Sequence, residues 1–580
     1  MRRAYRCDIG DGFHHHNDDL RKKRSRIRSI LRSEAFTIPI PSNTPMVRLS
    51  IEPSVCDASI TLKYDPKYPA TMNNDNLYDL LASGFAEDHR APCLITTQGH
   101  RWSWSDMQAE SARYAHLLKA QGAAPGERVA VQVDKSAQAL ALYLACLRVG
   151  AIYLPLNPAY PERELDHFLS DAEPAVVVGR PLFLDALRPL CEKYKVRSLL
   201  GLGADGEGSL IEQSRSLPRD FTTSPRKGDD PAALLYTSGT TGRPKGAMLT
   251  HANLSSNART LHAAWGFRAD DVLLHALPIF HVHGLFVACN TSLLNGSAML
   301  FFPDFDATRI CRALPQATIF MGVPTYYTRL LAREELTVSL CRGMRLFISG
   351  SAPLLEQTFL AFQQRSGHRI LERYGMTECG MSTSNPLEGE RRAGTVGRPL
   401  PGVDLRIVDD EGRRLAAGEV GGIEFKGPNV FSGYWRMPEA SAKEFTADGY
   451  FRSGDLGYVD DDGYITIVGR SKDLIISGGL NIHPKEVELL IDRLQGVEES
   501  AVIGLPHPDF GEQVCAVIVP STEAPTLDEG EMIEHLKRDL VNYKVPKRIF
   551  FTDSLPRNAM GKVQKNILRE RFGADASKTP

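Results

Sequence analysis

The 580-residue chain lacks the cysteine patterns of disulfide-rich and zinc-binding proteins. Its ten cysteines stand singly between Cys7 and Cys515, with no CxxC pair and no Cys/His spacing typical of zinc ligands. This usage argues against a disulfide scaffold and against a zinc site, and it fits a reducing compartment.

Long apolar runs and a one-sided charge are also missing. The longest apolar stretch, Ala139–Leu147, stops at Arg148 and is too short to span a bilayer, so it predicts a buried helix. The formal net charge of -2 gives no overall attraction to nucleic acid or to an anionic membrane. We therefore expect small-molecule partners, no nucleic acid and no membrane span.

Length and composition predict a globular enzyme of at least two domains. Hydrophobic residues make up 42% of the chain and charged residues 24%, which is ordinary for a soluble enzyme. A chain of 580 residues exceeds what one hydrophobic core usually supports. Low-complexity runs and internal repeats are absent.

The first seventy residues are rich in arginine and poor in apolar residues. The clusters Arg2–Arg6 and Arg21–Arg32 resemble a mitochondrial transit peptide. Interspersed aspartates and the run His14–His16 oppose this interpretation, because transit peptides avoid acids. A disordered leader or a misplaced start, with Met46 or Met72 as later starts, is the alternative. We expect a leader over residues 1–70 and a mitochondrial location, with the cytoplasm as the alternative.

From about Leu77, helix-period segments alternate with short apolar runs and predict an α/β fold. Val129–Val133 and Ala151–Leu156 are predicted strands, and Ser136–Arg148 is the predicted helix between them. This βαβ order implies a parallel sheet with helices on its faces. Further strands are predicted at Ala175–Val178, Asp271–Ala276, Ala298–Phe302, Thr318–Met321 and Met344–Ser349.

The pattern changes twice toward the C-terminus. After Gly397, short strands separated by glycine-rich and aspartate-rich turns predict a small β subdomain. After Arg470, strands alternate with helices such as Pro484–Leu494 and Asp528–Leu540, which predicts a small α+β domain. We expect a large N-terminal domain over residues 71–470, a mobile C-terminal domain over residues 471–573 and a tail over residues 574–580.

The string YTSGTTGRPKG, Tyr236–Gly246, has the residue types of a phosphate-binding loop. Glycines let backbone N–H groups approach phosphate, hydroxyls donate hydrogen bonds, and Lys245 supplies positive charge. It is not a Walker A loop, because Pro244 precedes the lysine where Gly-Lys-Ser/Thr is required. A merely flexible surface loop is the less favoured interpretation. The expected ATP contacts are Thr237, Ser238, Gly239, Thr240, Thr241, Gly242 and Lys245.

With this loop the chain resembles the adenylate-forming superfamily of acyl-CoA synthetases, luciferases and peptide-synthetase adenylation domains. The resemblance runs from about Leu77 to Phe572 and includes the strings GSAP at Gly350–Pro353, RYGMTE at Arg373–Glu378 and SGD at Ser453–Asp455. It implies an ATP-dependent acid–thiol ligase that forms an acyl-adenylate and transfers the acyl group to coenzyme A. ATP, Mg²⁺ and coenzyme A are the implied cofactors and co-substrates.

Several polar residues of the GSAP, RYGMTE and SGD strings, and Arg470, have an expected role. A carboxylate attacking the α-phosphate builds negative charge, which Mg²⁺ directed by Glu378 and a hydrogen bond from Thr377 would offset. By resemblance, Ser351 lies in an adenine-binding turn and Tyr374 stacks on adenine. Asp455 is expected to accept both ribose hydroxyls, joined by Arg470. In isolation, each motif is equally typical of a helix cap or an exposed turn.

The C-terminal residues complete the expected mechanism. By resemblance, Lys562 is the catalytic lysine that bridges the attacking carboxylate and the phosphate. Lys472 occupies the hinge position, about which the smaller domain swivels between two poses. The second pose presents Ser477, Gly478 and Gly479 to coenzyme A. No residue is assigned as the base for the thiol.

The strings LPIFHVHGL and GVPTYYTRLL resemble malonyl-CoA synthetases in particular. A dicarboxylate carries a second anionic end that needs a partner when buried, and Arg329, on a helix opened by Pro324, is the predicted anchor. His281, Ser351 and Met381 are the other expected substrate contacts. Many members have Thr-Asn-Met-Asn where this chain has Cys379–Ser382, and the smaller residues suggest room for methylmalonate.

Several alternatives stay open from sequence alone. Arg329 is also compatible with an arginine on a helix surface, and the histidines of FHVHG with core residues. The acid is alternatively a short-chain, medium-chain or aryl monocarboxylate. A non-catalytic nucleotide-binding relative is a different class, against which the intact motifs argue.

Overall fold

The computed structural model describes residues 74–237, 244–521, 528–558 and 561–576. The predicted leader over residues 1–70 lies outside the described residues, as do the last four residues of the predicted tail. No helix in the described ranges is long and apolar enough to cross a membrane. The expected α/β class is confirmed, with mainly parallel sheets in a large N-terminal part and a smaller C-terminal domain.

The first sheet has nine strands, and its central strands are parallel. Antiparallel strands close both edges. In spatial order the strands are β15 (Arg398–Pro399), β14 (Gly380–Ser384), β13 (Leu371–Met376), β12 (Leu346–Ser349), β11 (Ile319–Gly322), β9 (Val272–His275), β10 (Ala298–Phe301), β1 (Pro92–Thr96) and β2 (Arg101–Ser103).

The second sheet has six strands, five of them parallel, and ends in an antiparallel hairpin formed by its last two strands. In spatial order these are β6 (Ser198–Gly201), β5 (Val176–Gly179), β3 (Arg128–Gln132), β4 (Ile152–Pro155), β7 (Pro231–Thr237) and β8 (Lys245–Thr250).

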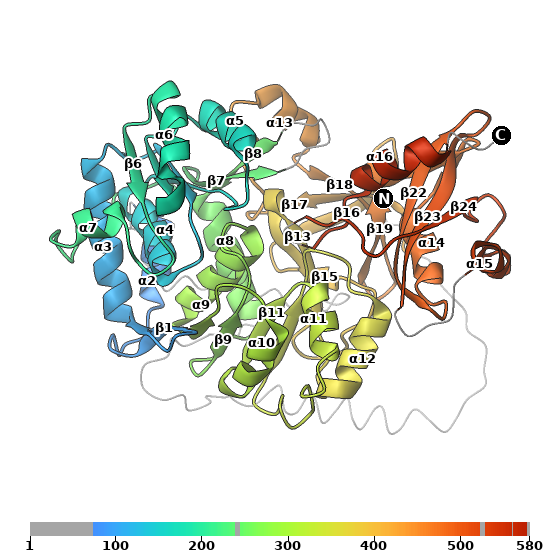
Figure 1. The fold of residues 1–580 in the computed structure, drawn as a ribbon, viewed down its shortest axis with the longest axis horizontal. Coiled ribbons are helices and arrows are strands. Elements are labelled where there is room, and N and C mark those ends of the chain that lie inside the picture. The colour runs from blue at the N-terminus through green and yellow to red at the C-terminus, as the bar shows by residue number, and fades with distance from the viewer. Residues whose placement is uncertain (1–73, 238–243, 522–527, 559–560, 577–580) are drawn as a thin grey trace, which may run out of the picture. The chain divides into compact units, whose positions relative to one another are not determined.

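Buried strands pack on both faces, because successive side chains point to opposite sides of a sheet. In β3, Val129 and Val131 join the main core, whereas Ala130 packs in a separate core with α5 and α6. A third core lies under α10, α11 and α12, which run side by side in Figure 1. These helices are α5 (Glu162–Ala172), α6 (Leu184–Lys193), α10 (Ala307–Ala313), α11 (Pro324–Leu331) and α12 (Glu356–Ser366).

The apolar run predicted to be a buried helix is α4 (Ala137–Val149), and the prediction is confirmed. The Ser136 side chain caps its N-terminus by accepting a hydrogen bond from the Ala139 N–H. Gly150 ends it with a φ of 80°, a left-handed conformation that glycine adopts without strain. Further helices of the N-terminal part are α2 (Leu77–Ser83), α3 (Trp104–Ala120), α7 (Ser209–Ser214), α8 (His251–Ala264), α9 (Asn290–Asn295) and α13 (Pro438–Glu444).

The predicted β subdomain after Gly397 contains a four-stranded antiparallel sheet. Its strands are β16 (Asp404–Val408), β17 (Gly421–Lys426), β18 (Phe451–Val459) and β19 (Ile465–Arg470). The C-terminal domain has a five-stranded sheet with a hydrophobic core on each face. Its elements are β20 (Ile475–Ser477), β21 (Leu480–Ile482), α14 (Pro484–Ile491), β22 (Val497–His507), β23 (Gly511–Pro520), α15 (Glu529–Leu536), β24 (Arg548–Phe551) and α16 (Lys565–Ala576).

Candidate functional site

The predicted phosphate loop connects the two strands of the β7–β8 hairpin. Thr237 at the end of β7 lies opposite Lys245 at the start of β8. The expected contacts Ser238, Gly239, Thr240, Thr241 and Gly242 lie outside the described residues. The flanking residues therefore locate the loop at the end of the second sheet.

Lys245, expected to supply charge to phosphate, has a protein partner in this structure. Its side chain is buried, and Nζ lies 3.2 Å from Oε1 of Glu444 in α13. Nζ also lies 4.8 Å from the ring centroid of Tyr434. A phosphate contact from Lys245 would have to compete with this ion pair.

Glu378 joins the RYGMTE motif to the phosphate-loop hairpin. It lies directly after β13 in a short turn, Thr377–Cys379, and its side chain is buried. Oε1 accepts hydrogen bonds from the Thr237 hydroxyl at 3.2 Å and the Tyr434 hydroxyl at 3.3 Å. Burial raises the pKa of the Glu378 carboxyl. Two sequence motifs thus meet at one carboxylate, with Thr377 half-buried beside it.

The side chains around Glu378 suit a magnesium ion only if oxygens of a bound phosphate complete its coordination. Across the described ranges, no group of three or more His, Cys, Asp or Glu side chains is placed to hold a metal. Mg²⁺ is commonly bound by one or two carboxylates plus substrate phosphates, and it prefers oxygen ligands. A single buried carboxylate beside hydroxyls and a phosphate-type loop fits that pattern.

The predicted nucleoside residues form a second cluster. Asp455 in β18 lies opposite Arg470 in β19, and Arg470 Nε is 2.9 Å from Asp455 Oδ1. The Tyr374 hydroxyl donates a hydrogen bond to the other carboxylate oxygen of Asp455. The Tyr374 ring stacks on Phe425 at 5.8 Å between centroids. Asp455, Tyr374 and Arg470 are therefore brought together, as their motifs predict.

Lys562 lies close to both clusters. It belongs to a tight turn closed by a bridge between Arg557 and Val563. Burial and then the charge of Arg470 lower the pKa of the Lys562 ammonium, while Asp455 and Glu378 act in the opposite direction. Part of the Lys562 side chain remains exposed to solvent. The structure thus places this amine beside the ATP motifs.

The Lys562 turn also approaches the predicted acid-binding elements. A Cβ added at Gly561 would lie 3.4 Å from the hydroxyl of Thr325, in the first turn of α11. Burial, together with the Lys562 charge, lowers the pKa of His281 to about 4. His281 is half-buried and neutral at physiological pH.

Arg373 is a buried guanidinium that sequence reasoning missed. The side chain is 2% exposed, and its Nε, Nη1 and Nη2 atoms have no hydrogen-bond partner. A Cβ at Gly350 would meet Nη1 at 2.4 Å, so glycine is required for this close approach. Burial lowers the pKa of Arg373 to about 9 and raises the pKa of the neighbouring Glu372 to about 8. The two side chains do not pair with each other, because Glu372 Oε2 also lacks a hydrogen-bond partner.

His283 and Ser351 lie beside this guanidinium. His283 Nδ1 is 3.2 Å from the Ser351 hydroxyl, and its buried Nε2 has no partner. Burial, followed by the charge of Arg373, lowers the pKa of His283 well below its usual value. Ser351 has a φ of 74°, a left-handed conformation that points to a constrained turn. Arginine, histidine and serine side chains therefore converge where β12 ends beside β13.

Arg329, the predicted anchor, is exposed instead of buried. In α11 the buried side chains are Tyr327 and Leu330, so a residue two positions after Tyr327 falls on the outer face. The structure does not place its guanidinium among the buried donors near Ser351. Met381, in contrast, is buried in β14, and its terminal methyl group would lie 2.6 Å from a Cβ at Gly375.

The predicted hinge and coenzyme A residues lie at the start of the C-terminal domain. Lys472 is in a short turn, Ser471–Asp473, where Arg569 Nη2 of α16 is 3.0 Å from Asp473. Ser477–Gly479 begins a tight turn between β20 and β21. Gly478 and Gly479 have φ values of 58° and 78°, which a two-residue hairpin turn requires. Both glycines are exposed.

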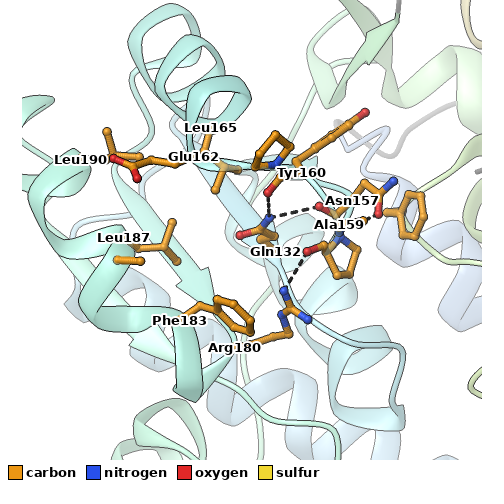
Figure 2. A pocket seen from close by; sticks show the side chains of 14 residues that line it. Gln132, Asn157, Ala159, Tyr160, Glu162, Leu165, Arg180, Phe183, Leu187 and Leu190 are labelled. Atoms are coloured by element: carbon orange, nitrogen blue, oxygen red, sulfur yellow. Dashed lines mark hydrogen bonds between the residues drawn. The ribbon is translucent and has the colours of Figure 1, made fainter.

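A cavity of about 600 Å³ lies at the carboxyl ends of β3, β4 and β5 (Figure 2). Gln132 Nε2 donates hydrogen bonds to the Asn157 and Tyr160 carbonyls at 3.1 and 3.3 Å. The Arg180 guanidinium donates to the Pro158 carbonyl and lies 4.0 Å from the ring centroid of Phe183. Ligands of open α/β sheets commonly bind at such strand ends. The sequence did not lead us to predict this cavity, although Arg180 directly after the parallel strand β5 was an available signal.

Comparisons with known proteins agree with the motifs. Residues 82–435 match the family described as AMP-binding enzymes, and residues 486–562 match the AMP-binding enzyme C-terminal domain. A malonate–CoA ligase of Arabidopsis thaliana is 36% identical over 480 residues, covering 77% of this chain and 78% of the relative. A feruloyl-CoA synthase of Amycolatopsis is 36% identical over 479 residues, covering 82% and 95%. The crystal structure of ATP-bound MatB from Rhodopseudomonas palustris is 50% identical, with a TM-score of 0.84, covering 86% of this chain and 99% of MatB.

Proposed function

The chain belongs to the AMP-binding enzyme family and is an acid–thiol ligase, and we propose that its acid is malonate. The proposed reaction joins malonate to coenzyme A through a malonyl-adenylate and releases AMP and pyrophosphate. The malonate–CoA ligase and the feruloyl-CoA synthase are equally identical to this chain, so relatedness alone does not select the acid. The choice rests on the chemistry of the acid-binding residues.

The observation that supports malonate is the Arg373 guanidinium without a partner. Arginine is almost never fully buried unless it is paired, because removing a charge from water is costly. Its planar fork matches a carboxylate with two parallel hydrogen bonds. The far carboxylate of malonate supplies that anion, with Ser351 and His283 as further hydrogen-bonding groups beside it. An aryl or alkyl acid would leave the guanidinium unpaired.

We propose that Lys562 promotes adenylation by lying between two anions. Its ammonium would meet the near carboxylate of the acid as that group approaches the α-phosphate of ATP, which lowers their repulsion. Glu378 and Thr237 would hold Mg²⁺, and the bound metal would offset charge on the phosphate oxygens. Tyr374, Asp455 and Arg470 would hold the nucleoside, with Asp455 exchanging its contact with Tyr374 for the ribose hydroxyls.

The 600 Å³ cavity is the candidate site for the nucleotide end of coenzyme A. An aromatic ring and a guanidinium, Phe183 and Arg180, are suited to a purine base and a phosphate group. The cavity wall includes Phe280, which directly precedes His281, a predicted substrate contact. Ser477–Gly479 remains the proposed contact for the thiol arm once the C-terminal domain turns about Lys472.

An acid panel tests the proposal. Purified protein with ATP, Mg²⁺ and coenzyme A would be assayed for AMP formation with malonate, methylmalonate, butyrate and 4-coumarate. We expect malonate to have the highest kcat/KM, and turnover of methylmalonate would support the wider pocket inferred from Cys379–Ser382. Faster AMP formation with butyrate or 4-coumarate would assign the enzyme to monocarboxylates instead.

A further inference from the structure

A second cavity, of about 140 Å³, lies beside the larger one, and Lys135 is among the residues that line it. Lys135 follows β3, and its Nζ lies 2.7 Å from Nδ1 of His275 at the end of β9. The amine also donates to the His275 carbonyl at 3.0 Å and lies 4.3 Å from the Phe301 ring centroid. The two cavities share Pro158 and Phe280 in their walls.

The hydrogen bonds fix where the protons lie. His275 Nε2 is 2.9 Å from the Gly284 carbonyl, which only accepts, so Nε2 carries the imidazole proton. Nδ1 is then an acceptor for a hydrogen of the Lys135 amine. Burial and the Lys135 charge lower the pKa of His275 well below its usual value, so the ring stays neutral.

Lys135 is held by neutral groups rather than by a carboxylate. Both of its hydrogen-bond partners belong to His275, and Cys289 and then Asp304 act on it only at longer range. Burial lowers the pKa of Lys135 to about 7. A neutral amine that donates both of its hydrogens keeps its lone pair available for bond formation.

We propose that Lys135 is an acyl-acceptor site, modified by the activated acyl group that the enzyme itself produces. The cavity is walled by Pro278, Ile279 and Phe280, which belong to the string LPIFHVHGL with the predicted substrate contact His281. Its volume corresponds to several water molecules, enough for a three-carbon acyl group. The inference rests on the proposed function for the identity of that group.

The modification is an acyl transfer that needs no further reactant. The Lys135 nitrogen attacks the acyl carbonyl carbon, and a C–N bond forms while the C–S bond of the thioester breaks. The sulfur leaves with the bonding electrons and takes up the proton that the nitrogen loses. An acyl-adenylate reacts in the same way, with the C–O bond broken and AMP released.

Peptide mass spectrometry of the full chain tests this inference. One arm supplies malonyl-CoA without ATP, and the other supplies ATP, Mg²⁺ and malonate without coenzyme A, which separates the thioester from the adenylate as donor. We expect Lys135 to be malonylated before exposed lysines in at least one arm. Labelling should be about tenfold slower at pH 6 than at pH 8, because the neutral amine becomes scarce below its pKa.

Two variants and one control complete the test. Lys135→Arg keeps the hydrogen-bond donors and should lose the label, whereas Lys119→Arg, at an exposed position of α3, should keep it. Lys562→Ala is expected to lose adenylation, but malonylation of Lys135 from supplied malonyl-CoA does not need that step and should continue. Failure of the proposed ligase function is thereby distinguished from failure of the acyl-acceptor inference. Label confined to exposed lysines such as Lys119, with Lys135 unmodified in both arms, would overturn the proposal.

Discussion

Replacing Arg373 with methionine tests the proposed acid anchor directly. Methionine keeps a flexible, unbranched chain in the space but removes the guanidinium. Malonate would then bury a carboxylate without its partner, and breaking a buried ion pair in this way costs about 3–5 kcal/mol. Because 1.4 kcal/mol corresponds to a factor of ten, kcat/KM for malonate should fall by about 150-fold to 5,000-fold.

The same substitution should affect stability in the opposite direction. In the structure Arg373 is buried, and all three guanidinium nitrogens lack partners. An unsatisfied buried polar group costs about 1–3 kcal/mol, so Arg373→Met should raise the free energy of unfolding by a similar amount in the absence of acid. Malonate should raise the thermal midpoint of the wild type, because it binds the folded state, and should leave that of the variant unchanged.

The assay compares AMP formation from malonate and from butyrate, with Arg329→Met as the matched control. Arg329 is exposed on α11, so its loss should leave the malonate-to-butyrate ratio close to wild type. Arg373→Met should lower that ratio at least about a hundredfold. If Arg329→Met removed malonate use and Arg373→Met did not, the assignment of the anchor would be refuted. An equal loss for both acids would mean that Arg373 only supports the fold.

Three further outcomes follow from the site and the C-terminal domain. Lys562→Ala should abolish malonate-dependent pyrophosphate release yet leave thioester formation from supplied malonyl-adenylate largely intact; loss of both would contradict a role confined to adenylation. Asp455→Asn should raise the KM for ATP about tenfold or more, as expected for charged hydrogen bonds worth about 1.5–3 kcal/mol, while the KM for malonate stays unchanged. Burial raises the pKa of Asp492 to about 6, so the native state binds more protons than the unfolded chain between about pH 4 and 6, and stability should fall as pH rises through that window. Asp492→Asn should flatten this fall in urea titrations, and an unchanged slope would exclude Asp492 as its source.

Local patterns predicted the elements of the fold well. The strand predicted at Val129–Val133 is observed as β3, and the uninterrupted apolar run Ala139–Leu147 forms most of the buried helix α4. The predicted C-terminal helices are shorter in the structure, since α14 ends at Ile491 and α15 ends at Leu536. Helix ends depend on capping contacts that a periodic pattern does not contain.

Long-range pairing was not predictable from the same patterns. Nothing local indicates that β9 lies between β10 and β11, or that the parallel strands divide into two sheets. The hairpin partner of β7 was also missed, because Lys245 and Gly246 were interpreted as the end of the phosphate loop and no strand was predicted after them. Sequential strands are often neighbours, but crossover order in a parallel sheet is set by the packing of the helices.

The proposal of Arg373 beside the predicted anchor Arg329 shows what a motif alone leaves open. Arg329 was chosen because it lies on a helix near the predicted acid site, but the face on which it falls depends on where Tyr327 points. Arg373 stands in a strand in which Leu371 and Glu372 are also buried. A charged pair inside such a strand is unusual, and that departure from an apolar pattern was the available signal.

The pairing of charges in the structure suggests why the acid's far end would control specificity. Asp455 is already paired with Tyr374 and Arg470, and Lys245 with Glu444, so ATP would exchange existing contacts for new ones. Because a contact is lost for each one gained, such an exchange yields less than the about 1.5–3 kcal/mol of a new hydrogen bond to a charged group. The Arg373 guanidinium has no hydrogen bond to exchange, and its proposed partner arrives with the acid. Discrimination between malonate and a monocarboxylate of similar length then follows from one unpaired guanidinium rather than from the size of the pocket.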